Sequence, residues 1–214
     1  MPVKIDEREY RNIETGQMET RTAEDGAMIV EGYATTFNQP YTLYREKNMI
    51  VREQVDQAAF AETDMSDAIM QYDHVGRVFA RVKNGTLGLE SDGHGLKIRA
   101  NLGGTEIGRQ LFEEIQGGYT NKMSFGFTVA DQKRTRSKDE DGNTVVLRTI
   151  TKIGKLFDVS AVSLPANDAT EISARSIGDG LIAEAMKEIQ ADEERARKIG
   201  EIRKILKGEE NHDE

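Results

Sequence analysis

The stretch KMSFGFTVA, residues 122–130, decides the fold. Large apolar residues alternate along it with small or polar ones, and this period of two is typical of a β-strand with one buried face. The face that we expect in the core carries the large members: Met123, Phe125 and Phe127. The opposite face carries Ser124 and Gly126. Because glycine has no side chain, another backbone or a substrate could come close to the serine hydroxyl.

Strand-like segments continue on both sides of this stretch. Each is short, rich in apolar and β-favouring residues, and bounded by turn residues such as Asn84-Gly85 and Asp92-Gly93. The predicted strands cover residues 28–37, 49–55, 68–72, 77–82, 86–90, 96–102, 145–153 and 156–164. Segments 77–82 and 86–90 are expected to pair, and the charged segment 132–143 to form a long exposed loop. The fold class is therefore predicted to be mainly β (α+β).

Helices are expected in three places. After Thr105, which can cap a helix, apolar residues recur four apart until Gly117-Gly118 ends the pattern. A short helix is predicted over 57–63, and an amphipathic helix in the charged C-terminal region. The predicted organisation is an N-terminal arm over residues 1–27, one domain over residues 28–176 and an amphipathic helical tail over residues 177–214.

Composition and missing motifs exclude several function classes. A net charge of −9 argues against a general nucleic-acid binder, which needs a basic face, and against docking on an anionic membrane. The absence of cysteine excludes a thiol nucleophile and a thiolate metal site. We find no signal-peptide core, no membrane-length apolar run, no nucleotide-binding loop and no metal-ligand spacing. We therefore expect a cytoplasmic protein without cofactor or metal.

Ser124 and His74 could form a nucleophile and base pair. A serine hydroxyl needs a base whose pKa lies near the working pH, and histidine is the usual one. Of the three histidines, His94 lies in a predicted turn and His212 among the last charged residues, whereas His74 follows an apolar strand. Each residue also has an ordinary explanation, because Ser124 could face solvent and His74 could be a structural histidine.

The third member of such a site would be an acid that holds the imidazole by its other nitrogen. Asp158 lies within LFDVSAV, residues 156–162, and a buried charge in an apolar strand needs a partner. Asp73 is a poorer candidate, since side chains of adjacent residues such as Asp73 and His74 tend to diverge. The alternative for Asp158 is an acid on an edge strand that faces water.

The order of these pieces resembles the phage prohead protease family. The resemblance covers roughly residues 28–170 and rests on short pieces in this order: His74 with Gly76-Arg77, the hairpin 86–98, the helix ending in Gly117-Gly118, the segment 123–127 and DVSAVSLPA at 158–166. It implies a fold similar to herpesvirus assemblin, which is a mostly antiparallel β-barrel surrounded by helices. The C-terminal amphipathic helix is added to that fold.

The resemblance also implies an activity and its residues. The domain over 28–176 would be a serine endopeptidase, with Ser124 as nucleophile, His74 as base and Asp158 as the acid. The family pattern more often has Glu where this chain has Asp158, so the shorter acid needs a closer backbone.

The resemblance implies partners and a location as well. They are the major capsid protein and scaffold segments as protein substrates, a homodimer, and action in the host cell cytoplasm inside the assembling procapsid. The tail over 177–214 could be scaffold-like, removed by self-cleavage, or an ordinary packed helix. The alternative is a non-catalytic scaffold or capsid-binding protein that acts through its C-terminal helix.

Overall fold

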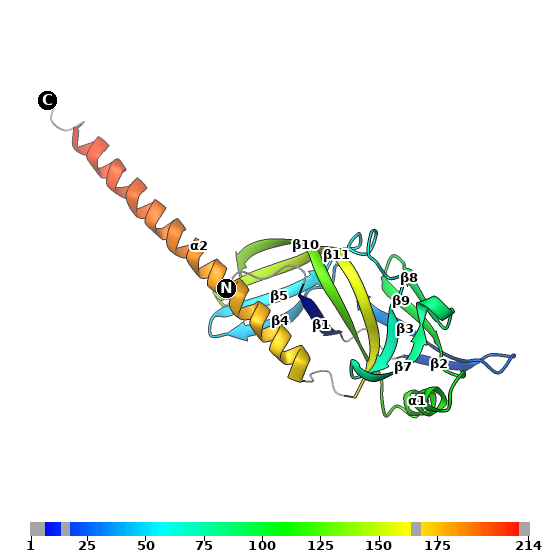
Figure 1. Ribbon diagram of the computed structural model, residues 1–214. Coiled ribbons are helices and arrows are strands. Elements are labelled where there is room, and N and C mark those ends of the chain that lie inside the picture. The colour runs from blue at the N-terminus through cyan, green and yellow to red at the C-terminus, as the bar shows by residue number, and fades with distance from the viewer. Residues whose placement is uncertain (1–6, 14–17, 164–167, 210–214) are drawn as a thin grey trace.

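A computed structural model describes residues 7–13, 18–163 and 168–209. The chain forms two β-sheets with one short helix against them and one long helix that extends away from them (Figure 1). The mainly β prediction is confirmed, and the larger sheet is curled into a half-barrel. In the part of the chain that the structure describes, neither helix is both long and apolar enough to cross a membrane.

The elements follow one another along the chain as strands, with one 3₁₀ turn and two helices. The strands are β1 (Arg8–Ile13), β2 (Glu19–Thr22), β3 (Met28–Thr36), β4 (Tyr41–Glu46), β5 (Met49–Val55), β6 (Ile69–Tyr72), β7 (Val75–Arg81), β8 (Leu87–Ser91), β9 (Gly95–Asn101), β10 (Lys122–Lys138) and β11 (Thr144–Val162). The helical elements are η1 (Val82–Asn84), α1 (Glu106–Gln116) and α2 (Asp168–Glu209).

The larger sheet is organised around the two longest strands. Its order is β1-β10-β11-β5-β4, and β6 also pairs with β11 and carries β7 on its other side. The smaller sheet has the order β2-β3-β9-β8. Most pairings are antiparallel, but β11 runs parallel to both β5 and β6. The pairing is therefore mostly antiparallel, as expected, except where β5 and β6 run in the same direction as β11, and the larger sheet is a half-barrel and not a closed barrel.

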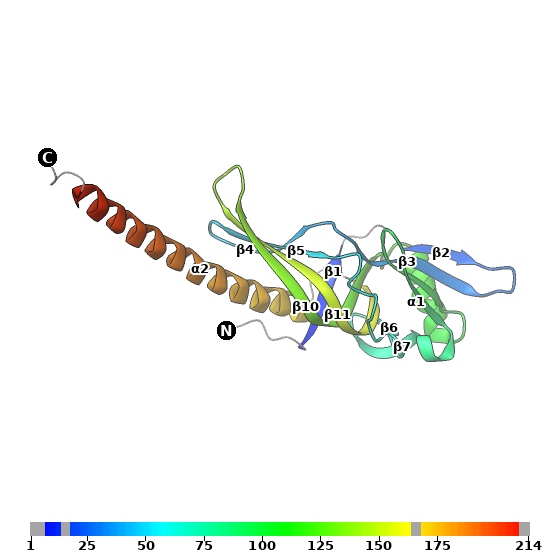
Figure 2. The same ribbon diagram turned by 90° about the horizontal axis from the view of Figure 1, so that it is seen from above.

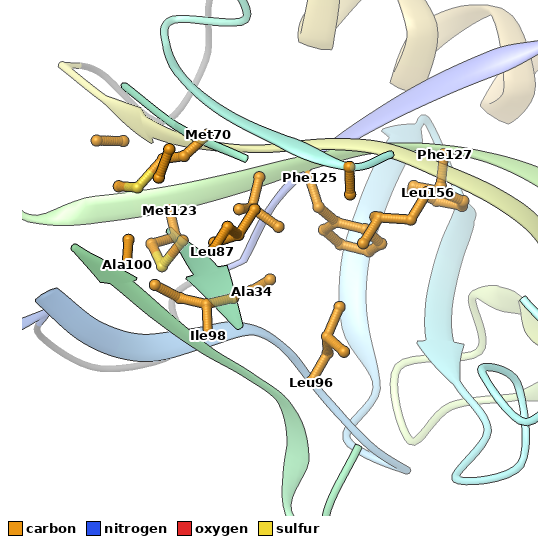
Figure 3. Close-up of a cluster of buried hydrophobic side chains, with 14 of the residues drawn as sticks. Ala34, Met70, Leu87, Leu96, Ile98, Ala100, Met123, Phe125, Phe127 and Leu156 are labelled. Atoms are coloured by element: carbon orange, nitrogen blue, oxygen red, sulfur yellow. The ribbon is translucent and has the colours of Figure 1, made fainter. Parts of the chain in front are cut away.

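The core lies between the two sheets and confirms the role given to the stretch 122–130. Met123, Phe125 and Phe127 are at most 2 % exposed. Figure 3 shows Met123 and Phe125 facing side chains of β9 such as Ile98. Fully burying a side chain of this size contributes about 1.5–3 kcal/mol, so these three fix which face of β10 turns inward. The other face of β10 is thereby directed away from this core.

The charged segment 132–143 is not a loop. β10 continues to Lys138 and pairs with β11, and only residues 139–143 form the tip of the hairpin, which projects from the sheets (Figure 2). Two arginines of this hairpin bind acids of α2: Arg134 pairs with Glu184 and Glu188, and Arg136 with Asp192. Cross-strand pairing and these ion pairs outweigh the polar composition on which the loop prediction rested.

Two further local predictions are wrong. Segment 86–90 pairs with β9 and not with β7, because Asn84-Gly85 ends a 3₁₀ turn and carries the chain from one sheet to the other. Gly85 takes the left-handed conformation there, with a φ of 75°. Residues 57–62 form consecutive turns instead of a helix.

The helix α2 is packed in its first part and exposed in its later part. A second hydrophobic cluster joins it to β4 and β5 through Ile177, Leu181, Ile182 and Ala185. Further along, Met186, Ile199 and Ile202 are exposed. The first turns of the segment 177–214 are thus attached to the larger sheet, while its later turns extend away from it (Figure 1).

Candidate active site

Ser124, His74 and Asp158 meet on the face of the larger sheet that points away from Phe125. The His74 Nε2 atom lies 2.5 Å from Ser124 Oγ, and His74 Nδ1 lies 2.5 Å from Asp158 Oδ1. One imidazole therefore contacts a hydroxyl with one nitrogen and a carboxylate with the other. The structure brings together all three residues that the sequence singled out.

The strand register explains why the serine and the aspartate share a face. β10 and β11 pair so that Ser124 lies opposite Ser160 and Gly126 opposite Asp158. Directly opposite residues point to the same side of a sheet, and so do residues two apart on one strand. Ser124 and Asp158 therefore project together from neighbouring strands.

The histidine comes from the turn that follows the next strand. β6 runs parallel to β11, with Ile69 beside Asp158. Asp73 and His74 form the turn between β6 and β7, both with positive φ, of 48° and 60°. Two successive residues with positive φ are typical of a tight hairpin turn, and Asp and His are among the residues that tolerate this conformation. The turn places His74 over β10 and β11.

The Asp158 carboxylate is buried but well supplied with donors. It accepts hydrogen bonds from His74 Nδ1, from Ser160 Oγ at 2.7 Å and from the Arg8 guanidinium. Burial by itself would raise the pKa of Asp158, but the hydrogen bond and charge of His74, the Ser160 hydroxyl and Arg8 together hold it below its ordinary value. The carboxylate is thus kept ionised, which suits it to orient the imidazole and stabilise its charged form.

Gly126 is required by this packing. A methyl group added at its Cα would meet Asp158 Oδ2, and it would lie 3.0 Å from the Tyr10 ring and 3.1 Å from Arg8 Nε. The space beside Ser124 that the missing side chain leaves is therefore filled by the carboxylate and by β1.

The other candidates lie elsewhere. The Asp73 carboxylate binds the Ser163 backbone N–H and hydroxyl. His94 packs its ring against Tyr33, with ring centroids 4.6 Å apart. His212 lies outside the described residues. Arg77 is exposed.

The N-terminal strand β1 also contributes to the site, although the sequence did not place it there. Arg8 binds Asp158, the Tyr10 ring lies against His74 with centroids 4.5 Å apart, and the Arg11 carbonyl accepts a hydrogen bond from Ser124 Oγ at 2.9 Å. No apolar periodicity marked this polar segment as part of a sheet. Ser160 was also missed, although its place two residues after Asp158 on one strand puts it on the same face.

A second buried polar group lies on the other side of β10, and we call it the interior charge cluster. It consists of Glu9, Arg11, Glu53 and Arg148. Glu53 accepts from Arg11 Nε at 2.5 Å and from Arg148 Nη1 at 2.6 Å. Glu9 accepts from Arg11 Nη2 at 2.5 Å and from Arg148 Nη2 at 2.8 Å. Each carboxylate thus bridges both guanidinium groups.

Comparison with known families agrees with the geometry. The family model of the caudovirus prohead serine proteases (Peptidase_S78) matches residues 16–182, which span most of the chain. The chain belongs to this family. This prohead protease therefore has a peptidase activity that acts in capsid maturation, in the assembling procapsid of a bacteriophage. The matched range contains all three residues of the candidate site.

A solved structure and curated sequences add little. The structure of the bacteriophage T4 capsid assembly protease is similar at 14 % identity, with 72 % of this chain and 98 % of that chain covered and a TM-score of 0.39. A TM-score this low carries no argument about the site. No curated protein matches the chain in sequence.

Proposed function

We propose that this prohead protease is a serine endopeptidase with Ser124 as nucleophile, His74 as general base and Asp158 as the acid that orients the base. The observation that carries the proposal is the pair of contacts of 2.5 Å from one imidazole to Ser124 Oγ and to Asp158 Oδ1. Nucleophile, base and orienting group within hydrogen-bond reach are the signature of an activated serine.

The reaction then follows from the geometry. His74 Nε2 takes the Ser124 proton while Oγ attacks the scissile carbonyl carbon and forms a tetrahedral oxyanion. The imidazolium, held by Asp158 through Nδ1–H, gives that proton to the leaving amine as the peptide bond breaks. Water activated by His74 then attacks the acyl-serine, and the carboxylic acid product leaves with Ser124 restored.

We extend the proposal to substrates and assembly. The substrates are the major capsid protein and scaffold segments, and the chain itself where self-cleavage occurs. Membership in the prohead protease family supports a capsid substrate. The proposal also includes a homodimer, which rests on the family resemblance alone. It includes action in the host cytoplasm and a protease domain over residues 28–176, which rest on the sequence pattern and on that resemblance.

The tail over 177–214 is proposed to bind capsid or scaffold protein. The exposed apolar side chains on the later turns of α2 support this role. The packed first turns, including Leu181 and Ala185, indicate that only the later turns are free to bind a partner.

The first test is co-expression with the capsid protein encoded nearby in the genome, followed by mass spectrometry of all chains. The wild type should give defined fragments and Ser124→Ala none, because the hydroxyl is the nucleophile. His74→Ala should slow cleavage by about 10⁴-fold or more. His94→Ala is the matched control and should cleave like the wild type, since His94 packs on Tyr33.

Fragments from Ser124→Ala would dismiss this serine. If no chain is cut by any variant, wild type included, the non-catalytic scaffold function gains support instead.

A further inference from the structure

The candidate triad is closed to solvent. Ser124 and Asp158 are 0 % exposed, and the side chain of His74 is 4 % exposed. A general base and nucleophile can act only on a peptide that comes within hydrogen-bond reach of them. Some part of the protein must therefore move before a substrate reaches Ser124 Oγ.

The strand β1 lies beside the part of β10 that carries Ser124. It runs antiparallel to β10, with Asn12 opposite Ser124 and Tyr10 opposite Gly126. It is also the last strand on its side of the larger sheet, so its departure would leave every other strand pairing of the described residues intact and would expose the edge of β10. An exposed strand edge is a template on which an extended peptide can add as a further strand.

Each member of the triad is contacted by a different residue of β1. The Arg11 carbonyl accepts from Ser124 Oγ, the Tyr10 ring covers His74, and Arg8 pairs with Asp158. The serine hydroxyl has one hydrogen, so it donates either to the Arg11 carbonyl or to His74 Nε2 at any moment. The strand therefore both covers the nucleophile and competes with the base for its proton.

We propose that β1 is an autoinhibitory strand. Residues 8–13 occupy the edge of β10 that receives the substrate peptide, and the protease becomes active when this strand leaves. The inference rests on the proposed function, because it concerns access to the same serine. It adds that substrates bind in extended form, antiparallel to β10, in the place that β1 now holds.

The composition of the interior charge cluster explains how β1 can leave without a buried charge losing its partner. Glu9 and Arg11 belong to β1, while Glu53 and Arg148 belong to β5 and β11. Departure of β1 removes one acid and one base together. Glu53 and Arg148 remain as a pair, with 2.6 Å between Oε2 and Nη1 in the closed form. The cluster thus binds β1 to the sheet through ion pairs. When β1 leaves, the cluster separates into two neutral pairs, so no buried charge is left unpaired.

A reversible disulfide bond between β1 and β10 tests the inference. Arg8 and Thr128 lie directly opposite each other on β1 and β10, and the chain has no cysteine, so R8C/T128C introduces the only two thiols. The probe is a biotinylated fluorophosphonate that reacts with an activated serine, and the measurement is its rate of attachment to Ser124 by mass spectrometry. The oxidised protein should react at least about ten-fold more slowly than the same protein after reduction.

Matched variants separate the effect of the disulfide bond from that of the substitutions. The single variants R8C and T128C carry the same substitutions without a cross-link, and reduction should not change their rates. Ser124→Ala should take up no probe. Tyr10→Gly removes the ring that covers His74 and the strand preference of tyrosine, so it should react several-fold faster than the wild type.

The outcomes distinguish the two proposals. Equal rates for oxidised and reduced R8C/T128C, or a Tyr10→Gly protein no faster than the wild type, would overturn autoinhibition while labelled Ser124 still supported the protease mechanism. If Ser124 is labelled in no form, including reduced R8C/T128C and Tyr10→Gly, the serine mechanism fails and the inference fails with it.

Discussion

The candidate triad and the interior charge cluster lie on opposite sides of β10, and both are built on buried, hydrogen-bonded carboxylates. In the candidate triad a histidine links a serine hydroxyl to Asp158, whereas in the interior charge cluster Glu9 and Glu53 each bridge two guanidinium groups. Both groups bury a carboxylate whose pKa is lowered, Asp158 in one and Glu53 in the other. Burial and a lowered pKa therefore do not identify a catalytic acid. What distinguishes Asp158 from Glu53 is a histidine that contacts both the carboxylate and a serine hydroxyl.

The largest effect that separates the two groups is expected for Asp158→Asn. The neutral amide no longer holds the imidazole in the tautomer that leaves Nε2 free to accept the Ser124 proton, so the rate of peptide cleavage should fall by about 10⁴-fold. The free energy of unfolding should fall by only about 1 kcal/mol, because the Arg8 side chain that pairs with the carboxylate is partly exposed. Cleavage kinetics and urea unfolding measure the two quantities.

Asp73→Asn is the control for this prediction. Asp73 adjoins His74 in sequence but binds Ser163. The rate of peptide cleavage by Asp73→Asn should therefore stay near that of the wild type. A loss of less than ten-fold for Asp158→Asn, or an equal loss for Asp73→Asn, would assign the orienting role to another group.

The reverse pattern is expected for Glu53→Gln. Loss of this carboxylate leaves Arg11 and Arg148 buried with only Glu9 between them, and breaking a buried pair in this way costs about 3–5 kcal/mol of unfolding free energy. Urea unfolding provides the measurement. The control is Glu62→Gln, whose pair with Lys152 lies at the surface, so this substitution should lower the free energy of unfolding far less than Glu53→Gln does. Equal losses in the two variants would show that the interior cluster does not hold the fold.

The sequence allowed the candidate triad to be predicted because its strands are locally regular. The alternation around Ser124 and the apolar run around Asp158 both reflect a period of two, which survives in any sheet that buries one face. His74 could be selected because the chain has only three histidines. These local patterns do not show that the three residues meet in space. That expectation came from the family resemblance, which implied a fold for pieces in this order.

The rest depends on contacts between distant segments that leave no local pattern. Glu53 and Arg148 are 95 residues apart, and Arg11 and Ser124 are 113 apart. The polar segment around Arg11 has no apolar face, so nothing in it indicated that it would lie beside the triad. The parallel pairing of β11 with β5 and β6 is likewise a property of the whole sheet.

The pH dependence of stability gives the smallest of these effects and compares the two carboxylates in one protein. Burial alone would raise the pKa of Glu53, but Arg11 and Arg148 outweigh it and lower the pKa from 4.5 to about 2. A carboxyl group with a lowered pKa in the folded state stabilises the fold fully above its ordinary pKa, and this contribution is lost as the pH falls through the folded value. The unfolding free energy should therefore decline as the pH falls from 4.5 to about 2.

Variants assign this acid sensitivity to one side of β10 or the other. Glu53→Gln has already lost the titrating group, so its unfolding free energy should decline less than that of the wild type over the same range. Asp158→Asn should show a similar but smaller change, because the pKa of Asp158 is also lowered, with one of its donors partly exposed. Urea unfolding at pH 5 and at pH 3 measures the decline in each protein. If the unfolding free energy of both variants declines as much as that of the wild type, the acid-sensitive groups lie outside the candidate triad and the interior charge cluster. Only cleavage rates would then distinguish the triad from the cluster.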